Sequence, residues 1–430
     1  MRGSTTSVRA VAAAMIAVCA LVLAGCTSPV DANPDDREEI GTPFDSEITG
    51  RLDAALAEAM SLSGSSGAIA GVWAPWAGHW VVSPGTTTIG GSAPLSTDMH
   101  FRIGDNTRSM TCTVLLRLVD EGVVKLSDPV SEYLERFSDV DGITLGQLCQ
   151  NTSGLSDYAA GLAPYFVNNP TREWPPLEVF SAGLALDRLG EPGATFGQSR
   201  TGLVLLGMAL EAATNKDWPT LYRQHIFEPL GLADTSFPDS GQLDLPSPHP
   251  HGYAPLLTPA GQAVCETVRD ETRLSPSSSW VAGGAVSTVS DLKVWVEALA
   301  EGSLLTEESA QDQWATVPMG DAPGWQAFGL GAQQVGPFRG DSGAIPGYLS
   351  AMLSDPASGL TVVVMLNNSH AGATFVQTLA QRLASIASTA PPLGGEAAPD
   401  LAVPWTEEEM AAAIAATPVC PPPAVPPAAG

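Results

Sequence analysis

The sequence predicts an α+β fold in which strands from both ends of the chain enclose a helical middle. Residues 68–73 and 79–82 are short apolar runs joined by a Pro/Gly turn, a pattern typical of neighbouring strands. Strand patterns return at residues 328–331, 348–353 and 360–365. Helical periodicity dominates the long interval between these two sets of strands.

Three helices can be placed around the strands. Residues 47–62 form an amphipathic pattern before the first strand, and residues 373–385 form another after the last one. Residues 105–121 carry apolar side chains on one broad face and end at Gly122, a residue type that commonly closes helices.

The N-terminus has the features of an export signal. Arg2 and Arg9 precede an apolar run at residues 11–23, and Leu-Ala-Gly leads into Cys26. Such a run is too short to span a membrane comfortably, although an ordinary signal peptide or a membrane helix is the alternative. We expect residues 1–26 to be a lipoprotein signal peptide, lipidation at Cys26, and an extracytoplasmic protein anchored to the cell membrane.

The remaining chain divides by composition into three parts. Residues 27–45 are polar and contain Pro and Asp, as expected for a tether. Residues 46–390 are long enough for a sizeable core and form the main domain. Residues 391–430 are a Pro/Ala-rich C-terminal tail with one helix candidate, in which Thr406 caps an acidic first turn.

The net charge of the chain disfavours two classes of partner, nucleic acids and anionic lipid surfaces. It carries 46 acidic and 19 basic residues, which gives a net charge of −27. A surface this acidic disfavours nucleic acid and disfavours adsorption to anionic lipids by charge. The membrane contact expected here is the lipid anchor alone.

The segment at residues 101–122 begins Phe-Arg-Ile-Gly, continues with Asp105 and Arg108, and ends Val-Asp-Glu-Gly. It resembles the nucleophile segment of the serine β-lactamase and D-alanyl-D-alanine carboxypeptidase superfamily, where Phe-Arg-x-Gly precedes Ser-x-x-Lys. In that family the serine forms the acyl-enzyme and the lysine tunes its proton. Here Asp105 occupies the serine position and Arg108 the lysine position.

Two further motifs of the family are altered in the same way. The family's Tyr-x-Asn motif aligns through Pro192, Gly193 and Phe196, which places Gln198 at the tyrosine and Arg200 at the asparagine. The family's His-Thr-Gly motif, in the frame Gly-x-x-Gly-x-x-Pro-Gly-Tyr, aligns with residues 340–348. Asp341 then stands at the histidine position. Every side chain that would carry acyl transfer is replaced.

The resemblance extends over about residues 46–390. It includes Ile-Thr-Leu through Asn-Thr-Ser-Gly-Leu at 143–155, Glu-Pro-Leu-Gly-Leu within 226–237, and Ala-Gly-Gly within 280–288. It implies an antiparallel sheet covered by helices, an inserted all-helical region, and a cleft between them. The replaced residues would meet in that cleft.

The replacements predict a charge network instead of a catalytic centre. Arg108 and Arg200 stay protonated and cannot act as general bases, and Gln198 has no titrating proton. The resemblance brings Asp105, Arg108, Gln198, Arg200 and Asp341 together with formal charges that sum to zero. Since unpaired buried charges are costly, we expect Asp105 to bond Arg108 or Arg200, and Asp341 to bond an arginine. Alternatively, Asp105 simply caps the helix that follows.

A ligand site is also expected in the cleft where the replaced motif residues would meet, which we call the old cleft. Arg200 could release its partner to hold a carboxylate, such as a peptide C-terminus. The residues that the resemblance places around such a ligand are Arg108, Arg200, Ser342, Gly343 and Ala344.

Three other patterns do not supply a catalytic centre or a metal site. Ser290 and Lys293 form a Ser-x-x-Lys sequence, but the family begins a later helix there, so an N-cap role for Ser290 is favoured. Each residue step turns about 100° around a helix, so the side chain of Ser109, just after the altered motif, points away from the direction of the family's nucleophile. His249 and His251 lie in a Pro-rich loop, where a single histidine pair is usually incidental, so no metal and no cofactor is expected.

Four cysteines remain after the signal and the lipidated residue are set aside: Cys112, Cys149, Cys265 and Cys420. An even number in an exported chain favours disulfides, and three connectivities are available. The resemblance places Cys149 just before a turn that lies near the motif helix carrying Cys112. We therefore expect Cys112–Cys149 and, with it, Cys265–Cys420.

Three functions are compatible with these observations. The favoured one is an exported, lipid-anchored relative of the β-lactamases that has lost acyl transfer and binds or scaffolds at the envelope, with cell-wall peptides or envelope proteins as partners. The alternative is a rewired serine hydrolase of the D-alanyl-D-alanine carboxypeptidase or esterase type. A lipoprotein that hands a solute to a transporter is the third.

Overall fold

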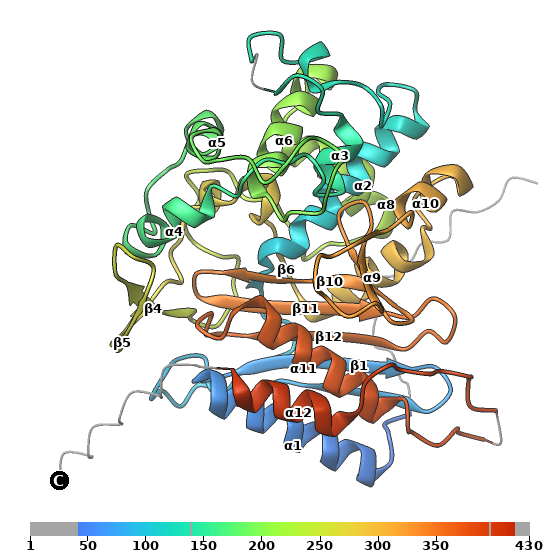
Figure 1. Ribbon diagram of the computed structural model, residues 1–430. Coiled ribbons are helices and arrows are strands. Elements are labelled where there is room, and N and C mark those ends of the chain that lie inside the picture. Colours follow the sequence, from blue (N-terminus) through green and yellow to red (C-terminus); the bar gives the residue numbers. More distant parts are fainter. Residues whose placement is uncertain (1–41, 138–139, 395–396, 418–430) are drawn as a thin grey trace, which may run out of the picture. The chain divides into compact units, whose positions relative to one another are not determined.

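The computed structural model describes residues 42–137, 140–394 and 397–417, and every structural statement below concerns these residues. Its centre is an eight-stranded antiparallel sheet in the order β2-β1-β12-β11-β10-β9-β8-β7 (Figure 1). The strands are β1 (Ala68–Ala74), β2 (Gly78–Val82), β7 (Val317–Pro318), β8 (Gln326–Phe328), β9 (Gln333–Val335), β10 (Phe338–Ile345), β11 (Tyr348–Ser354) and β12 (Thr361–Leu366). Strands from both ends of the chain therefore pair, as the sequence predicts.

The sheet separates two hydrophobic cores. Along β12, Val362 and Val364 face one core and Val363 and Met365 face the other, because successive side chains of a strand point to opposite faces. The first core lies under α1 (Ser46–Ser63), α11 (Gly372–Ala387) and α12 (Glu407–Ala416), which cover one face of the sheet (Figure 1). Burial on both faces explains the continuous apolar run in β12.

The second core continues from the opposite face of the sheet into a region made almost entirely of helices (Figure 1). Helix α9 packs directly on the sheet, and α2 runs from the sheet into this region. The helices are α2 (Thr107–Asp120), α3 (Leu145–Cys149), α4 (Ala159–Asn168), α5 (Pro176–Leu184), α6 (Arg200–Thr214), α7 (Trp218–Tyr222), α8 (Glu228–Leu230), α9 (Val289–Glu301) and α10 (Glu307–Gln313). Two small sheets, β3 (Phe101–Arg102) with β6 (Val286–Ser287) and β4 (Tyr253–Leu257) with β5 (Ala263–Asp270), complete it. The expected plan of a helix-covered antiparallel sheet with an inserted helical region is confirmed.

The ends of the main domain differ from the boundaries expected at residues 46 and 390. Phe44 is buried, and Thr42 accepts a hydrogen bond from the backbone of His79, so the last tether residues already pack on the domain. Helix α12 begins at the expected cap, Thr406, but its Ile414 is buried against the core rather than carried on a separate tail. Cys26 lies outside the described residues, and so do residues 1–41 and 418–430 as a whole.

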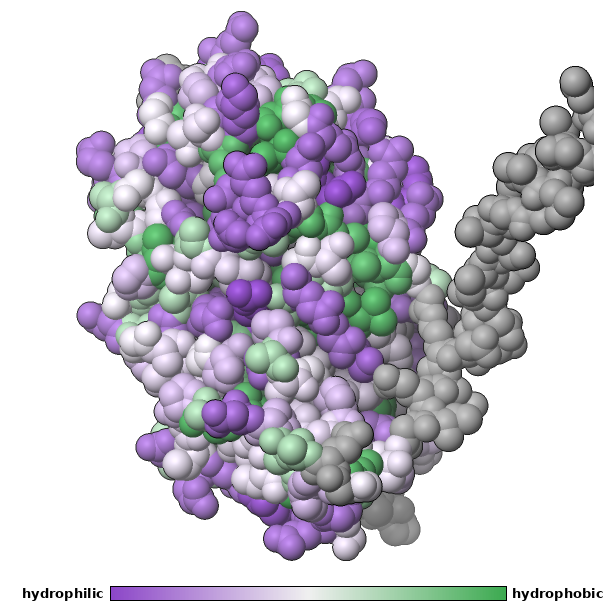
Figure 2. Space-filling view, turned by 90° about the vertical axis from the view of Figure 1, so that its right-hand side faces the viewer, coloured by the Kyte–Doolittle hydropathy of each residue, from purple (hydrophilic) through white to green (hydrophobic). Residues whose placement is uncertain are grey.

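The side of the molecule that Figure 2 presents is mainly hydrophilic. Figure 2 shows hydrophobic residues in small groups among hydrophilic ones on the side that it presents, in keeping with the net charge of −27. In the described ranges no helix is both long and apolar enough to cross a membrane.

Candidate functional site

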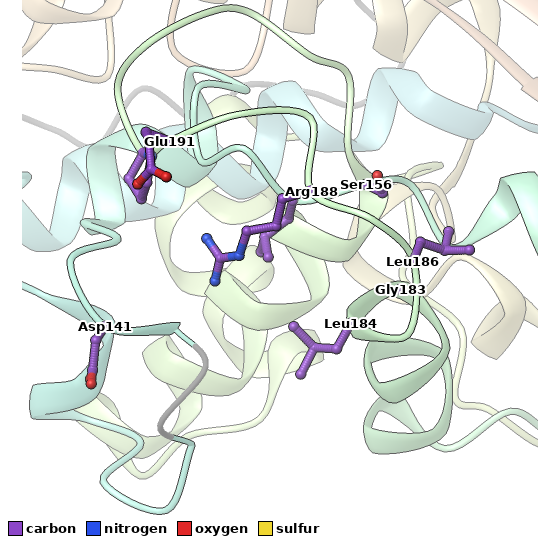
Figure 3. Close-up of a pocket in the computed structure, with 9 residues that line it drawn as sticks. Asp141, Ser156, Gly183, Leu184, Leu186, Arg188 and Glu191 are labelled. Carbon is purple, nitrogen blue, oxygen red and sulfur yellow. The ribbon is translucent and has the colours of Figure 1, made fainter.

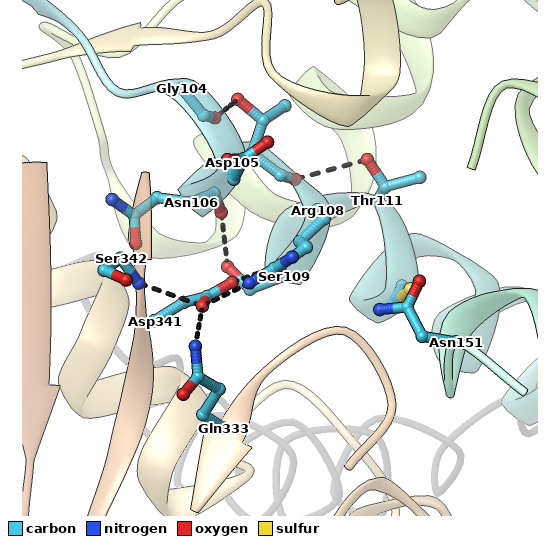
Figure 4. A network of polar contacts seen from close by, with 12 residues as sticks. Gly104, Asp105, Asn106, Arg108, Ser109, Thr111, Asn151, Gln333, Asp341 and Ser342 are labelled. Atoms are coloured by element: carbon cyan, nitrogen blue, oxygen red, sulfur yellow. Dashed lines mark hydrogen bonds and ion pairs between the residues drawn. The ribbon is translucent and has the colours of Figure 1, made fainter. Parts of the chain in front are cut away.

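The candidate site forms where the start of α2 meets the end of β10. Strand β10 pairs with β9 only through Phe338–Gly340, whereas its pairing with β11 continues to Ile345. The turn that carries Asp105 packs on this second half of β10 (Figure 4). A β-carbon on Gly343 would lie 2.6 Å from the backbone nitrogen of Asp105, so glycine is what permits this approach.

Asp105 is held by a two-point ion pair with Arg200. Arg200 Nε donates to Asp105 Oδ1 at 2.7 Å, and Nη2 donates to Oδ2 at 2.7 Å. The Asp105 side chain is 4% exposed and that of Arg200 is 22% exposed. Arg200 Nη1 also donates to Asp157 Oδ2 at 3.1 Å. Burial alone would lower the pKa of Arg200, but Asp105 and Asp157 outweigh burial and raise it above its ordinary value.

A second ion pair lies behind the first. Arg108 donates through Nε and Nη2 to Asp341 at 2.5 and 2.6 Å, and both side chains are almost fully buried. The same carboxylate accepts Gln333 Nε2 and the backbone N–H of Ser342, each at 2.9 Å (Figure 4). Burial disfavours the charged guanidinium, but Asp341 overcomes this and raises the pKa of Arg108. With four donors on Asp341, both oxygens of its carboxylate are hydrogen-bonded.

The expected self-paired network is therefore present, with Asp105 bonded to Arg200 and Asp341 to Arg108. The alternative role of Asp105 as a helix cap is not: the N-cap of α2 is Asn106, and no side chain caps it. Asp105 faces Arg200 instead, because a bidentate arginine satisfies both carboxylate oxygens. Gln198 is exposed and, among the described contacts, makes no hydrogen bond to these four charged residues.

The old cleft survives as a small cavity of about 200 Å³ between the helical region and the end of β10. Its wall is mainly apolar, with Arg200 at one side. Of the five residues expected to bind a ligand, Arg200 and Ala344 line this cavity, while Arg108, Ser342 and Gly343 are buried outside its lining. The lining residues are Tyr158, Ala159, Ala163, Phe166, Val167, Arg200, Ser279, Ala344, Ile345, Pro346 and Ser369.

Three residues of this site escaped the sequence analysis. Asp157 shares Arg200, Gln333 supports Asp341, and Tyr158 lines the cavity. Tyr158 is buried and donates its hydroxyl to the backbone oxygen of Ser278 at 3.0 Å. Burial raises the pKa of Tyr158 far above its ordinary value, so its phenol stays protonated. Asp157 lies two residues past the Asn-Thr-Ser-Gly-Leu segment. Extending the comparison with the family by these two residues is the sequence signal that could have pointed to it.

Among the described residues, no histidine or lysine is hydrogen-bonded to the serine hydroxyl groups near the site. Ser109 is buried, donates to the backbone oxygen of Asn106, and accepts the indole N–H of Trp295. Ser279 and Ser369 line the cavity. In the part of the chain that the structure describes, neither is hydrogen-bonded to a histidine or a lysine. Ser290 lies within the first turn of α9 and is exposed, and Thr288 is the N-cap that was expected at Ser290.

The cysteines agree with the expected pairing where the structure describes them. Cys112 on α2 and Cys149 at the end of α3 form a disulfide with a Cα–Cα distance of 5.7 Å. Cys265 is also disulfide-bonded. Cys420 lies outside the described residues, so its pairing with Cys265 stays a prediction. No group of three or more metal-binding side chains occurs in the described ranges.

A second cavity of about 370 Å³ lies within the helical region (Figure 3). Arg188, Glu191 and Asp141 contribute charges of both signs to its lining. Its lining includes Pro192, which belongs to the second motif frame, but none of the five replaced motif residues.

Known proteins with similar sequences or structures cover most of the chain. D-alanyl-D-alanine-carboxypeptidase/endopeptidase AmpH of Escherichia coli (strain K12) is 27% identical over 314 residues, which are 67% of this chain and 76% of that protein. Esterase EstB of Burkholderia gladioli is 26% identical over 303 residues, 62% of this chain and 70% of that protein.

Solved structures agree with these matches. A D-stereospecific amidohydrolase from a Streptomyces species superposes with a TM-score of 0.66 at 27% identity, covering 76% of this chain and 95% of that one. D-amino acid amidase from Ochrobactrum anthropi SV3 reaches 0.64 at 25% identity, covering 75% and 91%. The Beta-lactamase family model matches residues 52–386. With this match, the fold and the three motif frames, the chain belongs to the β-lactamase family, whose superfamily consists of serine hydrolases.

Proposed function

We propose that this protein is a member of the β-lactamase family that has lost acyl transfer and acts as a binding or scaffolding module at the cell envelope. The observation that carries the proposal is the bidentate ion pair between Asp105, at the nucleophile position, and Arg200. A carboxylate at this position would repel the oxyanion that develops during acyl transfer. Arg108, at the position of the family's lysine, cannot accept a proton.

The cavity beside Arg200 supports binding of a small ligand with an apolar group. Its walls include Phe166, Val167 and Ile345, which suit an aliphatic or aromatic side chain. The relatives named above include a D-alanyl-D-alanine-carboxypeptidase/endopeptidase, a D-stereospecific amidohydrolase and a D-amino acid amidase. We therefore assign the cavity to an amino acid or short peptide with an apolar side chain and a free carboxylate.

Arg200 can take that carboxylate by exchanging one of its present partners. Asp157 bonds it through one contact of 3.1 Å and is 20% exposed, whereas Asp105 bonds it through two contacts of 2.7 Å and is buried. Asp157 is the weaker partner, so a ligand carboxylate would displace Asp157 and leave the Asp105 pair intact.

The proposed location is outside the cytoplasm, with lipid-modified Cys26 as the anchor. The basic N-terminal residues, the short apolar run and the small residues before Cys26 support it. Relatives that are described as penicillin-binding proteins are consistent with it.

A rewired hydrolase is the second candidate, because Ser279 and Ser369 line the cavity. Turnover of D-phenylalanine amide, a D-alanyl-D-alanine peptide and p-nitrophenyl acetate by the mature chain separates the two candidates. The active controls are D-amino acid amidase for the amide, AmpH for the peptide and EstB for the ester. We expect no hydrolysis above buffer. Hydrolysis that disappears in Ser279→Ala or Ser369→Ala would establish the second candidate instead.

Binding is tested by calorimetry with N-acetyl-D-phenylalanine and its uncharged amide. The carboxylate should bind more tightly than the amide. Asp157→Asn should strengthen carboxylate binding, because it removes the competing charge, and Arg200→Ala should abolish it. Equal binding of acid and amide would contradict the assigned role of Arg200.

A further inference from the structure

We propose a second ligand site, for organic cations, in a cavity of about 430 Å³ on the helical region. The ligand class is an ammonium or guanidinium group on a short aliphatic stem, as in the side chains of basic amino acids. This site does not depend on the function proposed for the old cleft. Its lining residues are Glu173, Trp174, Pro175, Pro176, Glu211, Pro219, Phe237, Pro238, Asp239, Ser240, Ser277 and Trp280.

The charge of the lining has a single sign. Glu173, Glu211 and Asp239 contribute three carboxylates, and the lining contains no lysine, arginine or histidine. A cavity with several carboxylates and no basic group lowers the free energy of a bound cation and raises that of an anion. The size of the cavity falls in the range of about 300–1,000 Å³ that is usual for small-molecule sites.

Glu211 is the carboxylate best placed to pair with a buried cation. It is half-buried on α6, and no basic side chain in the described part of the chain forms an ion pair with it. Burial, followed by the charge of Asp217, raises the pKa of Glu211 to about 7. A ligand cation would relieve this unfavourable environment of the ionised carboxylate.

Aromatic rings supply the second half of the recognition. Trp174, Phe237 and Trp280 line the cavity, and indole faces are the strongest aromatic partners of cations. Trp174 already has the guanidinium of Arg172 3.7 Å from its ring centroid. That face of the Trp174 ring is therefore already occupied by a cation of the protein, and Trp280 and Phe237 are the other aromatic residues of the lining.

Trp280 occupies its position under backbone strain. Its φ is +42°, in the left-handed region that a tryptophan rarely adopts. Gly207 lies beneath the ring, and a β-carbon there would come within 2.7 Å of Trp280 Cζ3. The indole is thus held in place before any ligand arrives, which reduces the entropy lost on binding.

The probe is n-butylammonium, titrated into the mature chain by calorimetry, with n-butanol as the uncharged control and butyrate as the anionic one. We expect n-butylammonium to bind about tenfold more tightly than n-butanol, a difference of about 1.4 kcal/mol. Glu211→Gln should remove most of that preference. Glu132→Gln, an exposed carboxylate outside the lining, should leave it unchanged.

Gly207→Ala provides a test that retains every charge and every ring. The added methyl group must displace Trp280, so affinity for n-butylammonium should fall at least fivefold while n-butanol changes little. If the variant is unfolded by circular dichroism, Asp239→Asn at the exposed rim replaces it, with the same direction expected. Equal affinity for n-butanol, equal binding in Glu211→Gln, or displacement of the probe by millimolar Na⁺ would overturn the proposal.

Discussion

Replacing Arg200 with alanine should strongly destabilise the protein, because it leaves the Asp105 carboxylate buried without its two-point donor. The Asp105 side chain is 4% exposed, so water cannot replace the two hydrogen bonds that Arg200 donates. Removing one partner of a buried ion pair costs about 3–5 kcal/mol. Since 22% of the Arg200 side chain is exposed, we expect the lower end, about 3 kcal/mol.

The assay is urea unfolding of the mature chain at pH 7, followed by circular dichroism. A double-mutant cycle with Asp105→Ala isolates the pair: the double variant should be more stable than Arg200→Ala alone, because no unpaired carboxylate is left. Arg223→Ala is the matched control, since Arg223 pairs with Glu228 at an exposed position and should cost less than about 1 kcal/mol. Equal costs for Arg200→Ala and Arg223→Ala would refute the reasoning.

Four further outcomes are expected. Burial raises the pKa of Glu271 to about 7, so the folded state favours the protonated side chain. The contribution of Glu271 to the free energy of unfolding is therefore fully present below about pH 4.5 and is lost as pH rises through 7. Glu271→Gln should therefore stabilise the protein by about 2–3 kcal/mol more at pH 8 than at pH 5 in urea titrations. Reduction of the Cys112–Cys149 disulfide should cost about 2–4 kcal/mol by the same assay. Asp105→Ser alone should not restore hydrolysis of D-phenylalanine amide, because Arg108 supplies no base; measurable turnover would show that another group does. Cys26→Ala should move the protein from the membrane fraction to the soluble fraction or leave it uncleaved, and unchanged partitioning would contradict the anchor.

The architecture could be predicted because its elements carry local patterns. The helix pattern at residues 47–62 corresponds to α1, and the apolar run at 360–365 corresponds to β12. Residues 105–121 were expected to be one helix, but Gly104–Asn106 form a separate turn and α2 begins at Thr107. This turn packs against β10, a tertiary contact that no local pattern indicates.

The composition of the site was predictable, whereas its pairing was not. The motif frames identified the four charged residues, and charge neutrality predicted that they would pair. Asp105 and Arg108 are three residues apart, so a local pair was equally compatible with the sequence. In the fold, Asp105 instead pairs with Arg200. Arg108 pairs with Asp341, which lies 233 positions further along the chain. Asp157 lies two residues past a matched segment, but only the fold shows that it shares Arg200 with Asp105.

The central claim is that the position of the catalytic serine holds a paired carboxylate and that the protein forms no acyl-enzyme. Intact-mass spectrometry of the mature chain after prolonged incubation with benzylpenicillin tests it most directly, with penicillin-binding protein 4 of Amycolatopsis lactamdurans treated in parallel as the positive control. The account predicts an unchanged mass for this protein. A stoichiometric mass increase of one penicilloyl group, mapped by peptide sequencing to Ser279, Ser369 or another serine of the cleft, would contradict it.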